Sequence, residues 1–219
     1  MDAIMKKNGL ALAVAIAGAM AMTGAQGAET ATAIFAGGCF WSVESDFDHA
    51  PGVISTTSGY IGGHVPNPTY EEVVTETTGH REAVKVEYDP SVTSYEKLVD
   101  TYFHLIDPVE TRGQFCDFGE SYTSAIYVGS ADELKIAEAG KDATAKALGK
   151  PVATVIAMAP TFYPAEDYHQ NFWEKSDPYP FSGIPSKEHY ARYRAGCGKN
   201  GMVEAIWGKD AFRGLNGHA

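Results

Sequence analysis

A change of hydrophobic period at Asp89-Pro90 constrains the fold of this chain more than any other local feature. Before it, Val84, Val86 and Tyr88 alternate with polar residues, which is the two-residue period of a half-buried β-strand. After it, apolar residues recur at helical spacing over residues 95–106. A strand followed at once by an amphipathic helix predicts helices packed against a sheet.

The same alternation of strand and helix patterns continues along most of the chain. Beyond residue 176, Pro, Gly and charged residues dominate with little periodicity. We therefore expect an α/β (α+β) two-layer sandwich with a mixed sheet, a core of about residues 31–175 and a long irregular C-terminal tail over residues 176–219. The further expected elements are strands at residues 31–36, 124–128 and 152–158 and helices over residues 40–47 and 132–148.

The amino-terminal segment has the pattern of a bacterial signal peptide. Lys6 and Lys7 precede an uncharged run over residues 10–22, which is short for a membrane span, and small residues follow up to Gly27. We expect cleavage near Gly27, so that residues 28–219 form a single exported domain, periplasmic or secreted. An uncleaved anchor or interfacial helix is the alternative.

Charge and histidine spacing exclude several classes of function. The 219 residues carry a formal net charge of −11, with acidic residues spread along the chain, which disfavours binding to nucleic acid or to an anionic membrane. The seven histidines form neither an HxH nor an HExxH pattern, so we expect no metal site.

The three cysteines, Cys39, Cys116 and Cys197, all lie beyond the expected cleavage site. A disulfide framework usually has an even number of cysteines, so at least one thiol should be free, reactive or buried. No pair has CxxC spacing, which disfavours a zinc ribbon and a thioredoxin-like motif.

Cys39 follows Gly37-Gly38 at the expected start of a helix. Unpaired backbone N–H groups and the helix dipole stabilise an anion there, so we expect the thiol pKa to lie below its usual value of about 8.5. The alternative interpretation is a small buried apolar residue, which is common for free cysteine.

Several segments together resemble the A-type peptide methionine sulfoxide reductases, over about residues 34–170. An ordered set of this kind is far more specific than one short motif. The resemblance implies a ferredoxin-like plait core and reduction of methionine S-sulfoxide. The matching segments are Gly38-Cys39-Phe40-Trp41 with Glu44, Gly59-Tyr60-Ile61-Gly62-Gly63, Asn67-Pro68-Thr69-Tyr70, residues 78–84, Tyr88-Asp89-Pro90, residues 121–126 and residues 165–170.

The resemblance also implies the roles of individual residues. The Cys39 thiolate attacks the sulfoxide sulfur, and Glu82, kept neutral by a raised pKa, protonates the oxygen. Tyr70 and Tyr122 hold that oxygen, and Asp117 supports the group. Considered without the resemblance, the sequence would predict that Glu82 is a solvated carboxylate at the end of a strand and that the tyrosines pack in the core.

Phe40 and Trp41 would form an apolar wall around the methyl group of the substrate. Attack leaves a sulfenic acid on Cys39, so a second thiol is needed to form a disulfide. Our candidate for the resolving cysteine is Cys197, whose glycine neighbours give the backbone freedom. Cys116 is the competitor, and we expect it to be inert.

The implied enzyme is a monomeric peptide-methionine (S)-S-oxide reductase that uses thiol chemistry alone, with no metal, flavin or nucleotide cofactor. Its electron donor is expected to be a thioredoxin-like protein. Two other hypotheses remain open on the residues: a non-catalytic exported binding domain with inert thiols, and a general disulfide oxidoreductase or peroxidase. His80 and His169 are expected to tie loops by hydrogen bonds.

Overall fold

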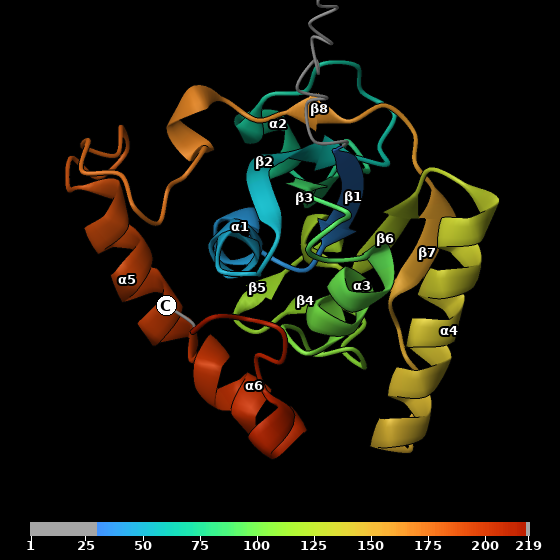
Figure 1. Ribbon diagram of the computed structural model, residues 1–219. Coiled ribbons are helices and arrows are strands. Elements are labelled where there is room, and N and C mark those ends of the chain that lie inside the picture. The colour runs from blue at the N-terminus through green and yellow to red at the C-terminus, as the bar shows by residue number, and fades with distance from the viewer. Residues whose placement is uncertain (1–29, 218–219) are drawn as a thin grey trace, which may run out of the picture.

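The structure, a computed structural model, describes residues 30–217, and the expected signal peptide 1–27 lies outside the described residues. A six-stranded mixed sheet has the strand order β7-β6-β1-β3-β2-β8 (Figure 1). Its strands are β1 (Ala31–Ala36), β2 (Val53–Ile61), β3 (Arg81–Tyr88), β6 (Ala125–Val128), β7 (Val155–Met158) and β8 (Tyr163–Pro164). A small hairpin consists of β4 (Gly113–Gln114) and β5 (Asp117–Phe118). The α-helices are α1 (Phe40–Asp48), α2 (Tyr70–Val73), α3 (Tyr95–Phe103), α4 (Ala131–Leu148), α5 (Ser186–Cys197) and α6 (Lys199–Trp207), and short 3-10 turns lie at Glu120–Tyr122, Asp167–His169 and Gly208–Asp210.

The centre of the sheet is a ferredoxin-like plait, as expected. The chain order β1-α1-β2-β3-α3-β6 places β1 between β3 and β6, and each neighbouring pair is antiparallel. Helix α4 then carries the chain to β7, which pairs in parallel with β6 and makes the sheet mixed.

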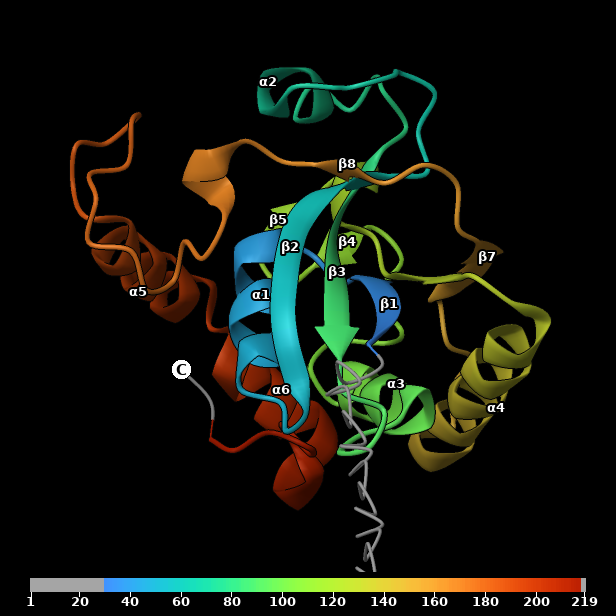
Figure 2. The ribbon, with the colours of Figure 1, turned by 45° about the horizontal axis from the view of Figure 1, so that its top comes forward.

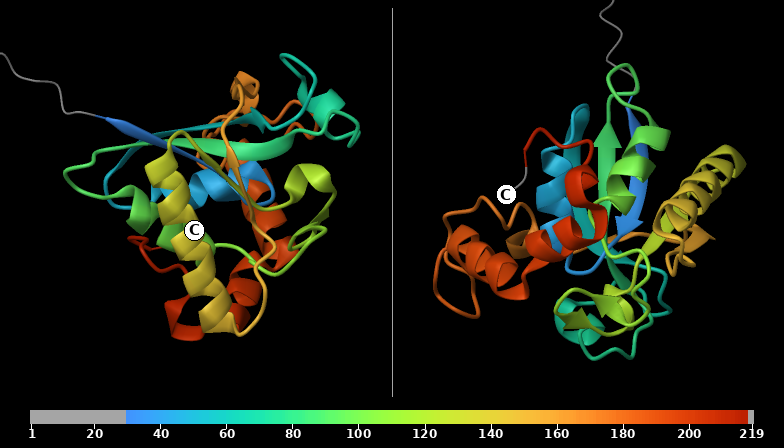
Figure 3. Two further views of the ribbon diagram at one scale, coloured as in Figure 1. Left: turned by 90° about the vertical axis from the view of Figure 1, so that its right-hand side faces the viewer. Right: turned by 90° about the horizontal axis from the view of Figure 1, so that it is seen from below.

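The long helices cover one face of this sheet and form the second layer (Figure 3). Alternate residues of β3 point to opposite faces, so Val84 and Val86 join the large helix-side core while Ala83 lies in a small cluster on the other face. Glu82 shares the face of Val84 and therefore points into the helix layer. Helices α3 and α4 approach closely at Gly140, where a Cβ would lie 2.6 Å from Val99.

The main errors of the sequence prediction concern β2 and the C-terminal tail. Strand β2 was not predicted, and β7 begins at Val155 rather than at residue 152. The tail is not irregular over residues 186–207, since α5 and α6 form there and pack beside α1 (Figure 2). Both helices bury charged residues, Arg194 and Lys199, so their inner faces show no apolar period. Among residues 30–217, no helix has the length and apolar character needed to cross a membrane.

Candidate active site

The local backbone places Cys39 at the N-cap of α1, directly after β1 and a two-glycine turn. Gly38 has a φ of 88°, a left-handed conformation that favours glycine, and a Cβ there would lie 2.7 Å from the Gln114 side chain. Gln114 is itself fixed, because its amide bonds the backbone N–H and C=O of Asp107. The loop that carries Cys116 and Asp117 is thereby held against the turn before Cys39.

Burial dominates the acidity of the Cys39 thiol, which keeps 9% of its surface exposed. Burial raises the pKa of Cys39 well above its ordinary value, and the Glu82 and Asp117 carboxylates raise it further. The Tyr193 hydroxyl and the Trp41 backbone N–H oppose this, because both are dipoles that favour a negative charge on the sulfur and so lower the pKa of Cys39. Cys39 does lie at a helix start, but the expected lowering of its pKa is wrong, because burial and two carboxylates outweigh the helix end.

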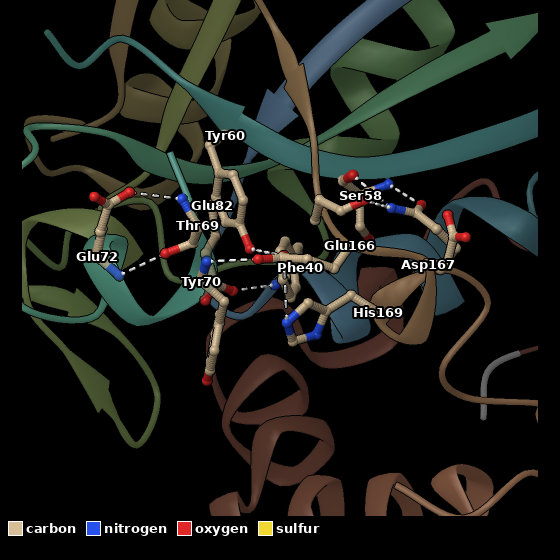
Figure 4. Close-up of polar contacts among 12 residues, drawn as sticks. Phe40, Ser58, Tyr60, Thr69, Tyr70, Glu72, Glu82, Glu166, Asp167 and His169 are labelled. Atoms are coloured by element: carbon tan, nitrogen blue, oxygen red, sulfur yellow. Dashed lines mark hydrogen bonds and ion pairs between the residues drawn. The ribbon is translucent and has the colours of Figure 1, made fainter. Parts of the chain in front are cut away.

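Glu82 lies at the beginning of β3 and is 2% exposed. Its carboxylate accepts a hydrogen bond of 2.9 Å from the backbone N–H of Phe40, the residue after Cys39 (Figure 4). Burial raises the pKa of Glu82 to about 8, although the Phe40 N–H and the Tyr122 hydroxyl act in the opposite direction. The pKa of Glu82 is therefore raised, as the sequence analysis expected.

Tyr70 begins α2, and its ring centroid lies 4.5 Å from that of the His169 ring (Figure 4). Glu166 fixes this position, because it accepts hydrogen bonds from the Tyr70 backbone N–H at 2.8 Å and from the Tyr60 hydroxyl at 2.9 Å. Thr69 and Glu72 close a reciprocal capping box at the start of the same short helix. The phenols of Tyr70 and Tyr122 are half-buried, and both have raised pKa values, chiefly through burial and then through Glu82. They therefore remain hydroxyl donors.

Phe40 and Trp41 are nearly fully buried and belong to an aromatic cluster. Trp41 stacks on Phe172 with 3.8 Å between ring centroids, and its indole N–H donates to His169 Nδ1 at 3.0 Å. The Phe40 ring lies 4.9 Å from the His169 ring. The structure thus confirms that His169 ties a loop, as His80 does through bonds to Gly63 and Val65.

Asp117 and Tyr193 complete the group, and the role of Tyr193 was not seen in the sequence. The Tyr193 hydroxyl donates to the Asp117 carboxylate, and it also lowers the pKa of Cys39. Tyr193 comes from α5, inside the segment that was expected to be irregular, so no apolar period marked it. Tyr193 directly precedes the buried Arg194, through which α5 bonds Asp46 of α1.

Cys116 and Cys197 are joined in a disulfide across 81 residues, with their Cα atoms 5.1 Å apart. The expectation that Cys116 is inert is therefore wrong, since its sulfur is bonded. Cys39 is a free thiol. Among the described residues, Cys116, Asp117 and Cys197 form the one group that could hold a metal ion, and the disulfide engages both of its sulfurs.

Residues 31–206 match the family model described as peptide methionine sulfoxide reductase. The chain belongs to the peptide methionine sulfoxide reductase family. The peptide methionine sulfoxide reductase MsrA of Bacillus pumilus is 48% identical over 177 residues, which cover 80% of this chain and 94% of that protein. MsrA 2 of Rhizobium meliloti is 46% identical over 192 residues, which cover 88% of this chain and 91% of that protein.

Two solved structures have a similar fold. Methionine sulfoxide reductase A of Corynebacterium diphtheriae has a TM-score of 0.61 and 32% identity, covering 74% of this chain and 85% of that chain. The reduced form of Mxr1 from Saccharomyces cerevisiae has a TM-score of 0.64 and 28% identity, covering 73% of this chain and 94% of that chain. The match to the family model includes α5, which carries both Tyr193 and Cys197, and extends to residue 206 in α6.

Proposed function

We propose that this protein reduces methionine S-sulfoxide, free and in proteins, to methionine, with Cys39 as its nucleophile. The observation that carries the proposal is the hydrogen bond from the Phe40 N–H to Glu82, which holds a buried acid beside the Cys39 thiol. An acid with a pKa of about 8 is mostly protonated near neutral pH, as a proton donor must be.

In the first step, the Cys39 thiolate attacks the sulfoxide sulfur while Glu82 gives its proton to the sulfoxide oxygen. The attack forms a bond between Cys39 Sγ and the substrate sulfur. The protonated oxygen then leaves the substrate sulfur as hydroxide and bonds Cys39 Sγ, while the sulfur–sulfur bond breaks and its electron pair stays on the substrate sulfur. The products are a thioether and a sulfenic acid on Cys39. The Tyr70 and Tyr122 hydroxyls donate hydrogen bonds to the oxygen as negative charge develops there. The buried Phe40 and Trp41 rings provide the apolar wall for the substrate methyl group.

In the second step, the Cys197 thiol loses its proton and attacks the Cys39 sulfur, and the sulfenic hydroxyl takes up that proton and leaves as water. The Cys116 thiolate then attacks Cys197, which releases the Cys39 thiolate and leaves the Cys116–Cys197 disulfide. This order retains Cys197 as the resolving cysteine, and it gives Cys116 the role of carrying the oxidation away from the substrate site.

A thioredoxin-like dithiol protein is the proposed reductant of that disulfide. Cys116 is exposed, so an incoming thiolate reaches its sulfur without entering the buried Cys39 site. We propose that the protein acts as a monomer. We further propose that the signal peptide 1–27 directs the protein to the periplasm or the exterior, where it repairs oxidised exported proteins. Amino-terminal sequencing of the protein from a fractionated host tests this assignment.

The deciding experiment is turnover of the resolved diastereomers of methionine sulfoxide with dithiothreitol. We expect the S diastereomer alone to be reduced, and Cys39→Ser to abolish the reaction. Activity that survives in Cys39→Ser, or preference for the R diastereomer, would contradict the proposal. A peroxide offered in place of the sulfoxide separates this function from that of a general thiol peroxidase.

A further inference from the structure

Aromatic side chains continue outward from the apolar wall of the site to the protein surface. The Tyr179 ring lies edge-on to Trp41, with 5.6 Å between the ring centroids, and the Phe181 ring lies 5.3 Å from that of Tyr179. Burial raises the pKa of Tyr179 most, and negative charges on Cys39 and Glu82 raise it further, so this phenol lies on the side of the reacting groups. Tyr179 is 6% exposed, whereas Phe181 is 62% exposed. Two ring contacts therefore connect the buried Trp41 with an open apolar surface.

A second contact leads from Phe181 back to the site through Tyr168. The ring centroids of these two residues are 6.0 Å apart. The Tyr168 ring also lies 4.2 Å from that of His169, against which the Tyr70 ring packs at 4.5 Å. Tyr168, Tyr179 and Phe181, which we call the aromatic rim, therefore border the site in which the sulfoxide is bound.

The loop that carries Phe181 is closed on itself by backbone hydrogen bonds. The Tyr179 N–H donates to the Ile184 carbonyl at 2.8 Å, and the Gly183 N–H donates to the Tyr179 carbonyl at 2.8 Å. Pro180, directly before Phe181, has a φ that is fixed by its own ring. The loop thus presents Phe181 in a defined position, so a ligand that covers this side chain does not have to order the loop first.

A single exposed apolar side chain is ordinary on a protein surface and by itself implies no ligand. Phe181 differs because it continues an aromatic path to the site, and because it is the most exposed large hydrophobic side chain among residues 30–217. An extended peptide advances roughly 3.3–3.6 Å per residue. Side chains one to three positions from an oxidised methionine can therefore reach a ring that lies two ring contacts from Trp41.

We propose that the aromatic rim is a subsite for peptide and protein substrates, in which Phe181 and Tyr168 bind an apolar side chain close in sequence to the oxidised methionine. The inference rests on the proposed function and names its preferred substrate class, which is methionine S-sulfoxide flanked by apolar residues. Burial of the flanking side chain against the two rings supplies the added affinity.

The experiment compares two capped heptapeptides, each with a central methionine S-sulfoxide and a lysine at either end. The two neighbours on each side of the sulfoxide are leucine in one peptide and serine in the other. We expect the unmodified chain, recycled with dithiothreitol, to have the higher kcat/KM for the leucine peptide. Phe181→Ser should lower this preference about fivefold, mainly through KM, because the leucine side chain loses part of its apolar burial. Phe181→Leu, which keeps an apolar side chain, should retain most of the preference.

Met158→Ser is the matched control, because Met158 is 58% exposed in β7, on the opposite side of the molecule from the loop that precedes α5 (Figure 1). It should leave the preference unchanged. The proposal is overturned if the unmodified chain shows no preference, if Phe181→Ser keeps the full preference, or if Phe181→Leu loses as much as Phe181→Ser. Were Phe181 instead a contact for the protein reductant, Phe181→Ser would slow turnover with a thioredoxin and leave the preference measured with dithiothreitol unchanged.

Binding measured without turnover separates this inference from the proposed function. Fluorescently labelled forms of the two peptides are titrated with the Cys39→Ser chain, and fluorescence polarisation reports the bound fraction. We expect tighter binding of the leucine peptide, and a smaller difference between the peptides when Phe181→Ser is added. Selective binding with no turnover by the unmodified chain would count against the proposed function alone. Turnover of both peptides with equal kcat/KM would count against the aromatic rim alone.

Discussion

The Phe40 backbone N–H donates to the Glu82 carboxylate across 2.9 Å, so the first residue of α1 holds the acid next to the N-cap residue Cys39. The negative charge of Glu82 raises the pKa of Cys39. Two such neighbours avoid being ionised together, and the thiolate is favoured when the acid carries the proton. The state with a Cys39 thiolate and a neutral Glu82 is the one that sulfoxide reduction requires.

Replacing the acid should remove most of the rate. Glu82→Gln keeps the size and an acceptor for the Phe40 N–H, but it has no proton to give, so we expect kcat to fall by about a hundredfold or more. Steady-state kinetics with methionine S-sulfoxide measures the loss. Glu87→Gln on the same strand is the control, since Glu87 bonds the exposed Ser55 hydroxyl. A Glu82→Gln enzyme with nearly full activity would assign the proton to another group.

The same acid should set the alkaline limit of the reaction. With a pKa of about 8, Glu82 loses its proton as the pH rises through that value, so the rate of the first step should fall there. A single-turnover pH profile from 6 to 10, recording methionine released, checks this prediction. In Glu82→Gln, the decrease in rate near pH 8 should disappear. The residual rate of this variant should only increase with pH, as Cys39 ionises.

Elements with a clear apolar period could be predicted from the sequence, and the others could not. β3 and α3 each keep one period and lie near their expected bounds. β2 lacks a period because its first residues are largely exposed and its last four are buried on both faces. Its β-branched residues were the available signal. Helices α5 and α6 bury Arg194 and Lys199 through Asp46, a partner about 150 residues earlier that no local pattern reveals.

The site residues also divide into those that the sequence could indicate and those that it could not. Cys39, Glu82, Tyr70, Asp117 and Tyr122 could be placed by resemblance, and the structure brings them together around one thiol. Neither the contribution of Tyr193 nor the pairing of the other two cysteines could be inferred, because both depend on how α5 packs against α1. The pKa of Cys39 was misjudged for a related reason: burial raises it most, and the carboxylates that raise it further come from distant strands.

Removal of the Tyr193 hydroxyl should impair both groups that it contacts. Tyr193→Phe deletes the hydrogen bond to Asp117 and removes the hydroxyl that lowers the pKa of Cys39, so we expect kcat/KM to fall by about tenfold, the value of one hydrogen bond to a charged group. The pH at which alkylation of Cys39 by iodoacetamide reaches half of its maximal rate should rise in parallel. Tyr95→Phe in α3 is the control, because it deletes a buried hydroxyl remote from the cysteines. Equal losses in the two variants would show a general packing effect.

The order of thiol exchange predicts which disulfide each variant accumulates. After one equivalent of sulfoxide, Cys116→Ser should trap a Cys39–Cys197 disulfide, because the acceptor of the next exchange is missing. Peptide mapping under non-reducing conditions identifies the bond. Cys197→Ser should release one equivalent of methionine and retain Cys39 as a sulfenic acid. A Cys39–Cys116 disulfide in that variant would mean that Cys116 resolves first and that the order proposed for the two cysteines is reversed.

Glu44, fully buried in α1, should make the folded protein less stable as the pH rises. Burial raises its pKa from 4.5 to about 7, so folding takes up a proton between these values and the favourable contribution is lost as the pH passes through 7. A shift of this size corresponds to about 3 kcal/mol between pH 4 and pH 8. Glu82, with the same direction of shift, adds to the slope. Urea unfolding of the reduced chain between pH 4 and pH 8 measures the free energy of unfolding. This free energy should depend less steeply on pH in Glu44→Gln than in the exposed control Glu96→Gln. Identical slopes in the two variants would mean that Glu44 is ionised in the folded state.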